Sequence, residues 1–413
     1  MMLWIQNPSE VVTCHAMQAK KGKDMQDIGR MTGVEILIQD DKILAIAPRV
    51  DLEAAYDLAQ AEVLDAKGHS VLPGFIDSHT HLVWGGERAE EFSWRLSGMD
   101  YMEIMNRGGG IAASVEKTRA ASKEELIKAA NERLDSMLRM GVTTVEAKSG
   151  YGLNLETERK QLRVVEELNQ IHAVDLVSTY MAAHAIPKGI GKEDYISSII
   201  EELAEIRKTT NAEFFDVFCE KNVFELADTK KLLDAAAGHG FSLKLHADEI
   251  VSLGGAELAV SMKATSADHL LQVTEDGVRA LAEGDTIATL LPGTAFSLQT
   301  DYAPARRLIE NGCALALASD LNPGSCHSES IPLIIALACL QMSMTIEEVI
   351  TALTINAAAA VNRLDTIGSL AVGKQADLIL LDAPSYFQLI YHLGVNSVKT
   401  VVKKGKVVYQ RDY

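Results

Sequence analysis

The sequence predicts an α/β protein: a (β/α)8 TIM barrel with a small composite β-sandwich domain from both termini. Two observations lead to this prediction. Between about residues 67 and 363, eight short apolar segments alternate with helix-like segments. Eight alternations in roughly 290 residues favour a closed barrel over an open doubly wound sheet, and no G-x-G-x-x-G follows a strand-like run. On either side, residues 1–66 and 364–413 are rich in short strand-like runs.

The two ends of the chain carry hairpin signals. Residues 34–48 form two alternating runs around a polar turn at 40–42, and residues 368–382 and 398–410 again suggest short strands, with a turn at Lys404-Gly405. Apolar alternation broken by such turn residues is typical of antiparallel pairs. We therefore expect residues 1–66 and 364–413 to form one small β domain, beside a barrel spanning 67–363.

Within the barrel region, each expected strand is a short apolar run and each expected helix has its own start signal. Ser122-x-x-Glu125 is a capping box that opens one expected helix, which has an apolar stripe along one face and ends at Gly141. Thr345-x-x-Glu348 opens another helix, which we expect to run to about Val361. The expected strands are residues 71–76, 142–147, 176–182, 213–218, 242–245, 264–267, 286–291 and 314–318.

Composition limits the classes of partner. The formal charge of −18 argues against nucleic acid or an anionic membrane surface. The five cysteines are scattered without a C-x-x-C pair, which indicates a reducing compartment. There is no secretory signal pattern, and the longest apolar run, residues 331–340, is too short to cross a bilayer. We expect a cytoplasmic protein that binds neither nucleic acid nor membranes.

In a (β/α)8 barrel the active site forms at the carboxyl ends of the strands. Of the eleven histidines, five fall at expected strand ends: His79, His81, His184, His246 and His269. His79, His81 and His246, with Asp320 after the eighth strand, form a set of three nitrogens and one oxygen that suits one zinc ion or one iron ion. The alternative for Asp320 is that it caps the turn at residues 322–324.

Three further side chains are candidates for chemistry. Glu249 follows His246 by three residues and is placed to act as general acid and base; the alternative is an N-terminal residue of the next helix, and both could be true. His269 could stabilise an oxyanion or share the proton transfer, or could be an ordinary core histidine. Lys148 could bring charge to the site or could be paired with a carboxylate.

Several longer motifs resemble one family. G-F-I-D-S-H-T-H-L-V-W-G-G-E-R, R-G-G-G-I, T-T-V-E-A-K-S-G-Y-G-L, A-A-H-A-I-P, K-L-H-A-D-E and S-D-L-N-P-G occur in that order. They are similar to motifs of the amidohydrolase superfamily, a family of metal-bearing barrels, and most closely to its imidazolonepropionase family. The resemblance runs from about residue 30 to the end of the chain.

The resemblance implies a reaction and a site. The reaction is hydrolysis of a small anionic imidazolone, 4-imidazolone-5-propanoate, to N-formimidoyl-L-glutamate in histidine degradation. One zinc or iron ion would be held by His79, His81, His246 and Asp320, with Glu249 as acid and base. The implied substrate contacts are Arg88, Tyr151, His184, Glu249, Asn322, Gly324 and Ser325. By analogy with similar barrels, we expect a homodimer.

Two other functions fit parts of this pattern. A deaminase of a cyclic amidine or nucleobase would use the same set of metal ligands and the same His-x-x-Glu motif. Arg88 separates the two, because a guanidinium binds a propanoate by paired hydrogen bonds and a neutral base needs no such clamp. A catalytically dead barrel that serves as a scaffold would be expected to have lost ligands, and none is lost here.

Overall fold

The computed structural model describes residues 2–99, 103 and 107–411. Its centre is a parallel sheet of eight strands in sequence order, each strand pairing with the next. The strands are β8 (Phe75–Thr80), β9 (Val142–Lys148), β10 (Asp175–Ala183), β11 (Phe214–Cys219), β12 (Ser242–Ala247), β13 (Ser266–His269), β14 (Ile287–Leu290) and β15 (Leu315–Leu317).

The sheet closes on itself between its first and last members. Thr80 of β8 forms a parallel bridge with Leu321, just after β15. Two backbone hydrogen bonds flank this bridge, from Asp320 N to His79 O at 3.1 Å and from His81 N to Leu321 O at 2.9 Å. The eight strands therefore form a barrel, as expected, and the seam that closes it runs through three candidate metal ligands.

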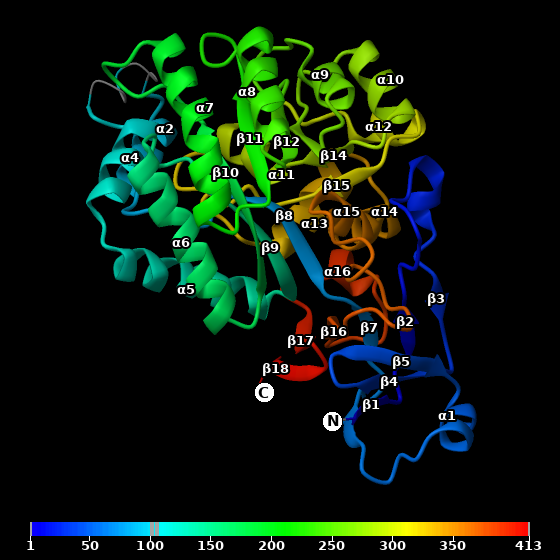
Figure 1. Ribbon diagram of the computed structural model, residues 1–413. Coiled ribbons are helices and arrows are strands. Elements are labelled where there is room, and N and C mark those ends of the chain that lie inside the picture. Colours follow the sequence, from blue (N-terminus) through cyan, green and yellow to red (C-terminus); the bar gives the residue numbers. More distant parts are fainter. Residues whose placement is uncertain (1, 100–102, 104–106, 412–413) are drawn as a thin grey trace.

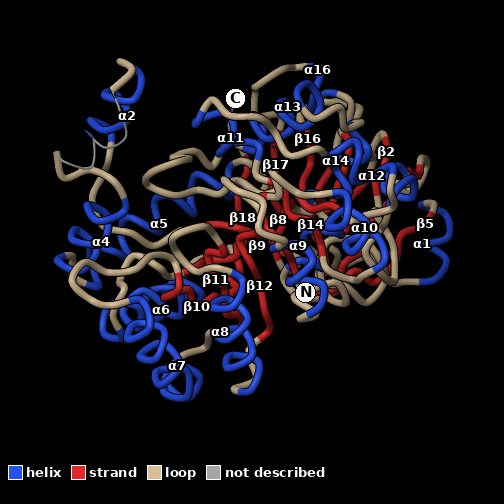
Figure 2. The backbone as a smooth tube through the Cα atoms, turned by 90° about the horizontal axis from the view of Figure 1, so that it is seen from above, coloured by secondary structure: helices blue, strands red, loops and turns tan. Residues whose placement is uncertain are grey.

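Helices surround the barrel, with the strands at the centre of the view from above (Figure 2). The 17-residue helix α5 (Lys123–Arg139) begins with the expected capping box, and the expected apolar stripe is buried. The other helices beside or between the strands are α2 (Ala89–Leu96), α4 (Ile111–Ala120), α6 (Leu155–Ile171), α7 (Lys192–Thr209), α8 (Leu226–Gly238), α9 (Gly255–Ser261), α10 (Glu275–Glu283), α11 (Pro292–Leu298), α12 (Ala305–Glu310), α13 (Ile331–Gln341), α14 (Ile346–Leu353) and α15 (Ile355–Ala360).

Two smaller sheets are built from the ends of the chain, the first from the N-terminal end alone and the second from both ends, and these ends lie together below the barrel (Figure 1). The first sheet has the order β5-β4-β1-β6: Lys42–Ala47, Glu35–Gln39, Met2–Gln6 and Glu62–Asp65. The second has the order β18-β17-β16-β7-β2-β3: Lys406–Gln410, Val398–Lys403, Leu378–Leu381, Ser70–Pro73, Glu10–Val12 and Arg30–Met31. Three short helices accompany them: the 3-10 helix η1 (Gly22–Gln26), α1 (Arg49–Ala55) and α16 (Gln388–Tyr391).

The predicted bounds of two elements were wrong. The expected strand 71–76 is two strands, because residues 70–73 pair with β2 and β16, whereas Phe75 begins the barrel. Gly74 lies between them, packed so closely on Thr143 that a Cβ would stand 2.4 Å from its methyl group. The expected helix 345–361 breaks at Thr354, whose φ of −125° and ψ of −95° are not helical, so α14 and α15 are separate helices.

The barrel interior directly beneath the strand ends is charged rather than apolar. Lys148 is fully buried, with its ammonium 2.9 Å from Glu146 and 2.7 Å from Asp216. Asp268 lies 3.8 Å from both Lys148 and the equally buried Lys244. Buried charges of this kind persist only when they are paired.

In the described part of the chain, no helix is long and apolar enough to cross a membrane.

Candidate metal centre and active site

Three histidines meet at the carboxyl ends of the barrel strands. His79 and His81 come from β8 and the residue after it, and alternation along an extended chain turns both side chains to the same side. His246 comes from β12, across the barrel. One ligand atom from each lies within 4.8 Å of the others, and all three residues are buried. This grouping is the expected one, and it requires the barrel to bring distant segments together.

Two carboxylates set the orientation of these rings. His79 Nδ1 is 2.6 Å from Asp268 Oδ2, and His246 Nδ1 is 3.1 Å from Asp216 Oδ1. The Nε2 atoms of both rings are buried and have no hydrogen-bond partner among the described residues. A histidine that donates one ring N–H to a carboxylate while its other nitrogen faces a cluster is the usual arrangement of a metal ligand.

Asp320 lies beside these three histidines. Its Oδ1 lies 3.6 Å from His79 Nε2 and 3.7 Å from His81 Nε2, too far for hydrogen bonds. Ligands around a tetrahedral zinc ion, with bonds of about 2.0–2.2 Å, lie about 3.3–3.6 Å apart. Asp320 is therefore at ligand spacing from His79 and His81, while among the described residues the three histidines alone form the group whose ligand atoms all lie within 4.8 Å of one another. The alternative that Asp320 caps the next turn does not hold, because Asn322 Oδ1 accepts the hydrogen bonds from Gly324 N and Ser325 N, both at 2.8 Å.

Burial favours the neutral form of two of the rings. It holds the pKa of His79 and of His81 well below the usual range, and nearby positive groups such as Lys148 add to the effect. For His246, burial acts to lower the pKa, but the Asp216 carboxylate outweighs it and raises the pKa. Burial therefore favours free lone pairs on His79 and His81, whereas a cation at His246 would compete with a proton that Asp216 favours.

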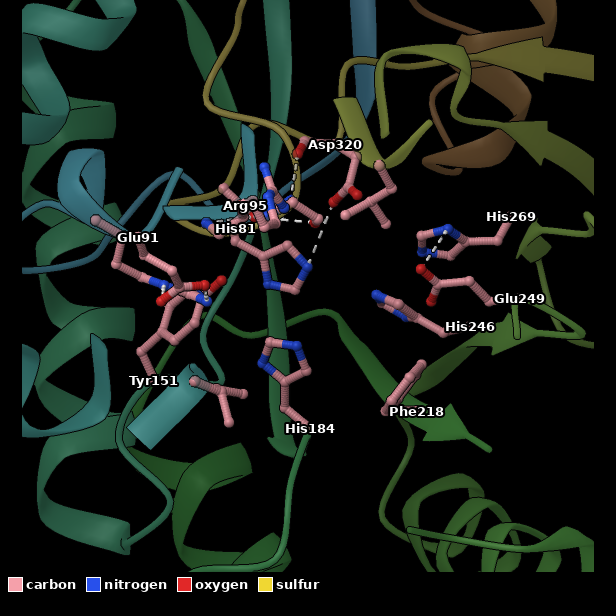
Figure 3. A pocket seen from close by; sticks show the side chains of 16 residues that line it. His81, Glu91, Arg95, Tyr151, His184, Phe218, His246, Glu249, His269 and Asp320 are labelled. Atoms are coloured by element: carbon pink, nitrogen blue, oxygen red, sulfur yellow. Dashed lines mark hydrogen bonds and ion pairs between the residues drawn. The ribbon is translucent and has the colours of Figure 1, made fainter. Parts of the chain in front are cut away.

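Glu249 and His269 lie on one side of this cluster (Figure 3). Glu249 Oε1 is 3.6 Å from His269 Nδ1, and both ring nitrogens of His269 lack hydrogen-bond partners among the described residues. His269 is therefore not a satisfied core histidine. Burial, followed by the charge of Asp320, raises the pKa of Glu249 to about 8. A carboxyl group with such a pKa exchanges protons readily near neutral pH.

The alternative in which Glu249 begins the next helix is wrong. Helix α9 begins at Gly255, and the side chain of Asp248 accepts hydrogen bonds from four amides at its start. These bonds measure 2.9 to 3.1 Å, from the backbone N–H groups of Leu253, Gly254, Gly255 and Ala256. Asp248 therefore stabilises the helix N-terminus, and Glu249 remains in the cavity.

A cavity of about 260 Å³ lies above the cluster. His79 lies beneath it, while the other sequence-based candidates line its wall: His81, Arg88, Tyr151, His184, His246, Glu249, His269, Asp320, Asn322, Gly324 and Ser325. Five lining residues were not anticipated: Glu91, Arg95, Ile111, Phe218 and Leu298. Lys148 is not among the lining residues; it is paired beneath the site, as one of its two interpretations required.

Tyr151 and His184 form another part of this wall. His184 stacks on His81 with ring centroids 4.7 Å apart, and its Nδ1 is 3.0 Å from Gly150 O. The loop that carries Tyr151 folds around the buried Glu158 carboxylate, which accepts hydrogen bonds from Gly150 N, Gly152 N and Leu153 N at 2.7 to 2.8 Å. Glu158 therefore sets the position of Tyr151 without reaching the cavity.

Sequence reasoning gave no role to Asp216 or Asp268, which hold the histidine rings, or to Glu91. A carboxylate inside an apolar strand, as in F-F-D-V-F-C, is a signal that could have identified Asp216. Glu91 and Arg95 follow Arg88 at helical spacing, which could have placed all three on one face.

Comparison with known proteins places this site in a family. The model of the Amidohydrolase family matches residues 70–408. The imidazolonepropionase of Clostridium tetani (strain Massachusetts / E88) is 51% identical over 412 residues, which are 99% of this chain and 98% of that protein. That of Parabacteroides distasonis is 52% identical over 406 residues, 98% of each chain.

Solved structures show the same fold at lower identity. A zinc-bound adenosine deaminase from Xanthomonas campestris superposes with a TM-score of 0.74 at 20% identity, covering 98% of this chain and 92% of its own. A 5-methylcytosine deaminase from Klebsiella pneumoniae gives a TM-score of 0.75 at 18% identity, covering 100% and 99%. Full-length relatives at about half identity decide the assignment: the chain belongs to the amidohydrolase family and, within it, to the imidazolonepropionases.

Proposed function

We propose that this chain hydrolyses the ring amide of 4-imidazolone-5-propanoate to give N-formimidoyl-L-glutamate. Membership of the family makes it a hydrolase of C–N bonds, and the relatives at about half identity are imidazolonepropionases. One observation carries the proposal: a single cavity holds the candidate metal cluster, Glu249 with its raised pKa, and two arginines for an anionic side chain.

His79, His81, His246 and Asp320 would hold one zinc or iron ion. When bound, such an ion polarises a carbonyl oxygen and lowers the pKa of water, which makes hydrolysis feasible at neutral pH. The orphaned Nε2 atoms of His79 and His246 support these residues as ligands. Their partner carboxylates, Asp268 and Asp216, keep the ring nitrogens pointed at the cluster.

Glu249 moves the proton in this proposal. It accepts a proton from the water whose oxygen adds to the ring carbonyl carbon. It then donates that proton to the ring nitrogen as the C–N bond breaks, which leaves a new carboxyl group and a free formimidoyl nitrogen. His269 lies beside Glu249 and holds the carbonyl oxygen while it carries negative charge. His184 and Tyr151 contact the other side of the substrate ring in this proposal.

The charged end of the substrate lies at the opposite wall in this arrangement. Figure 3 shows Glu91 and Tyr151 across the cavity from Glu249, His246 and His269, with Arg95 drawn between the two groups. A propanoate side chain directed to the arginines would leave the ring at the candidate metal cluster. Asn322, Gly324 and Ser325 form the loop between these two ends, which supports them as ligand contacts.

The test is to follow imidazolone loss by ultraviolet absorbance and to identify the product. We expect N-formimidoylglutamate in equal amount to the substrate consumed, and no ammonia. Ammonia release from a cyclic amidine or nucleobase, with no turnover of the imidazolone, would instead indicate a deaminase. The same proposal includes a homodimer in the cytoplasm, which light scattering of the purified chain and fractionation of cells would check.

A further inference from the structure

Three charged residues lie on one face of α2 and its start: Arg88, Glu91 and Arg95. Their spacing of three and four residues places them on the same side of the helix, and all three line the cavity. The resemblance that pointed to this site singled out Arg88 alone. The structure assigns different roles to Arg88 and Arg95.

Arg88 is already paired. Its Nε donates to Glu91 Oε2 at 2.8 Å, and its Nη2 donates to the other oxygen of the same carboxylate. Both groups are largely buried, with side chains 13% and 9% exposed. Glu91 Oε2 also accepts a hydrogen bond from Gly110 N at 2.8 Å. A two-pronged pair of this kind neutralises the guanidinium and fixes its plane.

Arg95 has no such partner. Among the described residues, no carboxylate forms an ion pair with it, and its two hydrogen bonds are long, 3.4 Å to Gly324 O and 3.4 Å to Ser297 Oγ. Its side chain is half-buried and extends past Phe92, with the guanidinium carbon 5.0 Å from the ring centroid. Burial lowers the pKa of Arg95 in spite of Glu91, yet an arginine stays charged in this setting.

Gly324 brings the two guanidinium groups together. A Cβ at this position would stand 2.2 Å from Arg88 Nη1, so Arg88 lies directly against the glycine, while Arg95 donates to its carbonyl. Two positive charges and one negative charge leave this part of the cavity with a net charge of +1. That charge matches one carboxylate.

We propose that Arg95 supplies the unpaired positive charge that binds the substrate carboxylate, and that Glu91 is a positioning residue that holds Arg88 beside it. This inference rests on the proposed function and names a specificity-determining residue for it. It also changes the expectation for Arg88, which would contribute shape and secondary hydrogen bonds rather than the net charge of the subsite.

The test uses the full-length metal-loaded chain and two substrates, imidazolonepropanoate and its uncharged propanamide. Arg95→Met keeps the length of the side chain and removes its charge; Arg95→Lys keeps the charge. The matched control is Arg279→Met, which removes an exposed arginine, paired with Asp276 on α10, from the same acidic chain. A parallel calorimetric titration with imidazole-4-propanoate measures binding without turnover.

We expect Arg95→Met to lower kcat/KM for the propanoate at least 30-fold, mainly through KM, and for the propanamide less than threefold. Losing one partner of a buried charge contact typically costs this much. Arg95→Lys should recover part of the lost kcat/KM, and Arg279→Met should leave kcat/KM unchanged for both substrates. Arg95→Met should weaken the binding of imidazole-4-propanoate in proportion to its loss of kcat/KM.

Equal losses on both substrates would show that Arg95 only supports the fold and would overturn the inference. So would a selective loss in Arg88→Met with none in Arg95→Met. Failure of the proposed function has a different signature, because the wild-type chain would then turn over neither imidazolone. The two failures are therefore separable in one set of measurements.

Discussion

Replacing Asp268 with asparagine should weaken metal binding while leaving the fold intact. Asp268 Oδ2 accepts from His79 Nδ1 at 2.6 Å, and both residues are fully buried. The bond keeps the proton on Nδ1 and the Nε2 lone pair toward the cluster. An asparagine amide in its place lacks the charge that favours this tautomer. Loss of such an outer partner typically costs 10–100-fold in metal affinity, or about 1.4–2.7 kcal/mol.

The change costs Lys244 its carboxylate partner at 3.8 Å, so some loss of stability is expected, but both buried lysines keep other hydrogen-bond acceptors. Lys148 keeps Glu146 at 2.9 Å and Asp216 at 2.7 Å, and Lys244 keeps Ser266 Oγ at 2.7 Å and Ala360 O at 3.0 Å. A suitable control is Asp377→Asn, which removes a buried carboxylate that pairs with Lys403 at 2.6 Å. Asp377 precedes β16, in the sheet outside the barrel.

The assay is competition for Zn²⁺ between the metal-free chain and a chromophoric chelator, with urea unfolding of each variant to check the fold. We expect Asp268→Asn to bind zinc 10–100-fold more weakly and Asp377→Asn to bind it normally. Wild-type zinc affinity in a folded Asp268→Asn chain would refute the reasoning, because His79 would then not depend on this carboxylate to present Nε2.

Three further predictions follow from single contacts. Glu249→Gln keeps the shape of the side chain but cannot accept a proton, so steady-state kinetics should show kcat lowered by roughly 10² or more with little change in KM; near-normal kcat would move the proton transfer to His269. Gly324→Ala would place a Cβ 2.2 Å from Arg88 Nη1 and displace that guanidinium from Glu91, so KM should rise roughly tenfold in a chain that still unfolds cooperatively in urea; an unchanged KM would show that this contact does not shape the site. Ser122→Ala removes the side-chain acceptor that caps α5, 3.1 Å from Glu125 N, so the free energy of unfolding should fall by about 1 kcal/mol in urea titrations with kcat unchanged; no change in stability would mean that the capping box contributes nothing.

Local signals in the sequence were sufficient for the barrel and for part of the site. The capping boxes at Ser122 and Thr345 and the buried stripe of α5 depend on contacts within a few residues, and the structure has them. The five histidines at strand ends follow from alternation in strands and from the rule that barrel sites form at carboxyl ends. The break at Thr354 has no comparable local signal, because a threonine is compatible with a helix.

What the sequence could not supply is the pairing of distant segments: the strand pattern can single out Asp216 as a buried carboxylate, but not the ring that it holds. Asp216 and Asp268 hold histidines 30 and 189 residues away in the chain. The split at Gly74 depends on Thr143 from the next strand. The sequence identified Arg88 as a residue of the site. Its ion pair with Glu91 depends on the rotamer of each side chain, and sequence spacing does not determine a rotamer. The assignment of Asp248, rather than Glu249, to the start of α9 likewise required the loop geometry.

The most direct test of the central claim measures metal content and turnover on one preparation. We predict about one zinc or iron ion per chain and loss of imidazolonepropanoate matched by N-formimidoylglutamate. Chelation should abolish this turnover without unfolding the barrel, and added Zn²⁺ or Fe²⁺ should restore it. Full turnover by a chain shown to be free of metal would contradict the account.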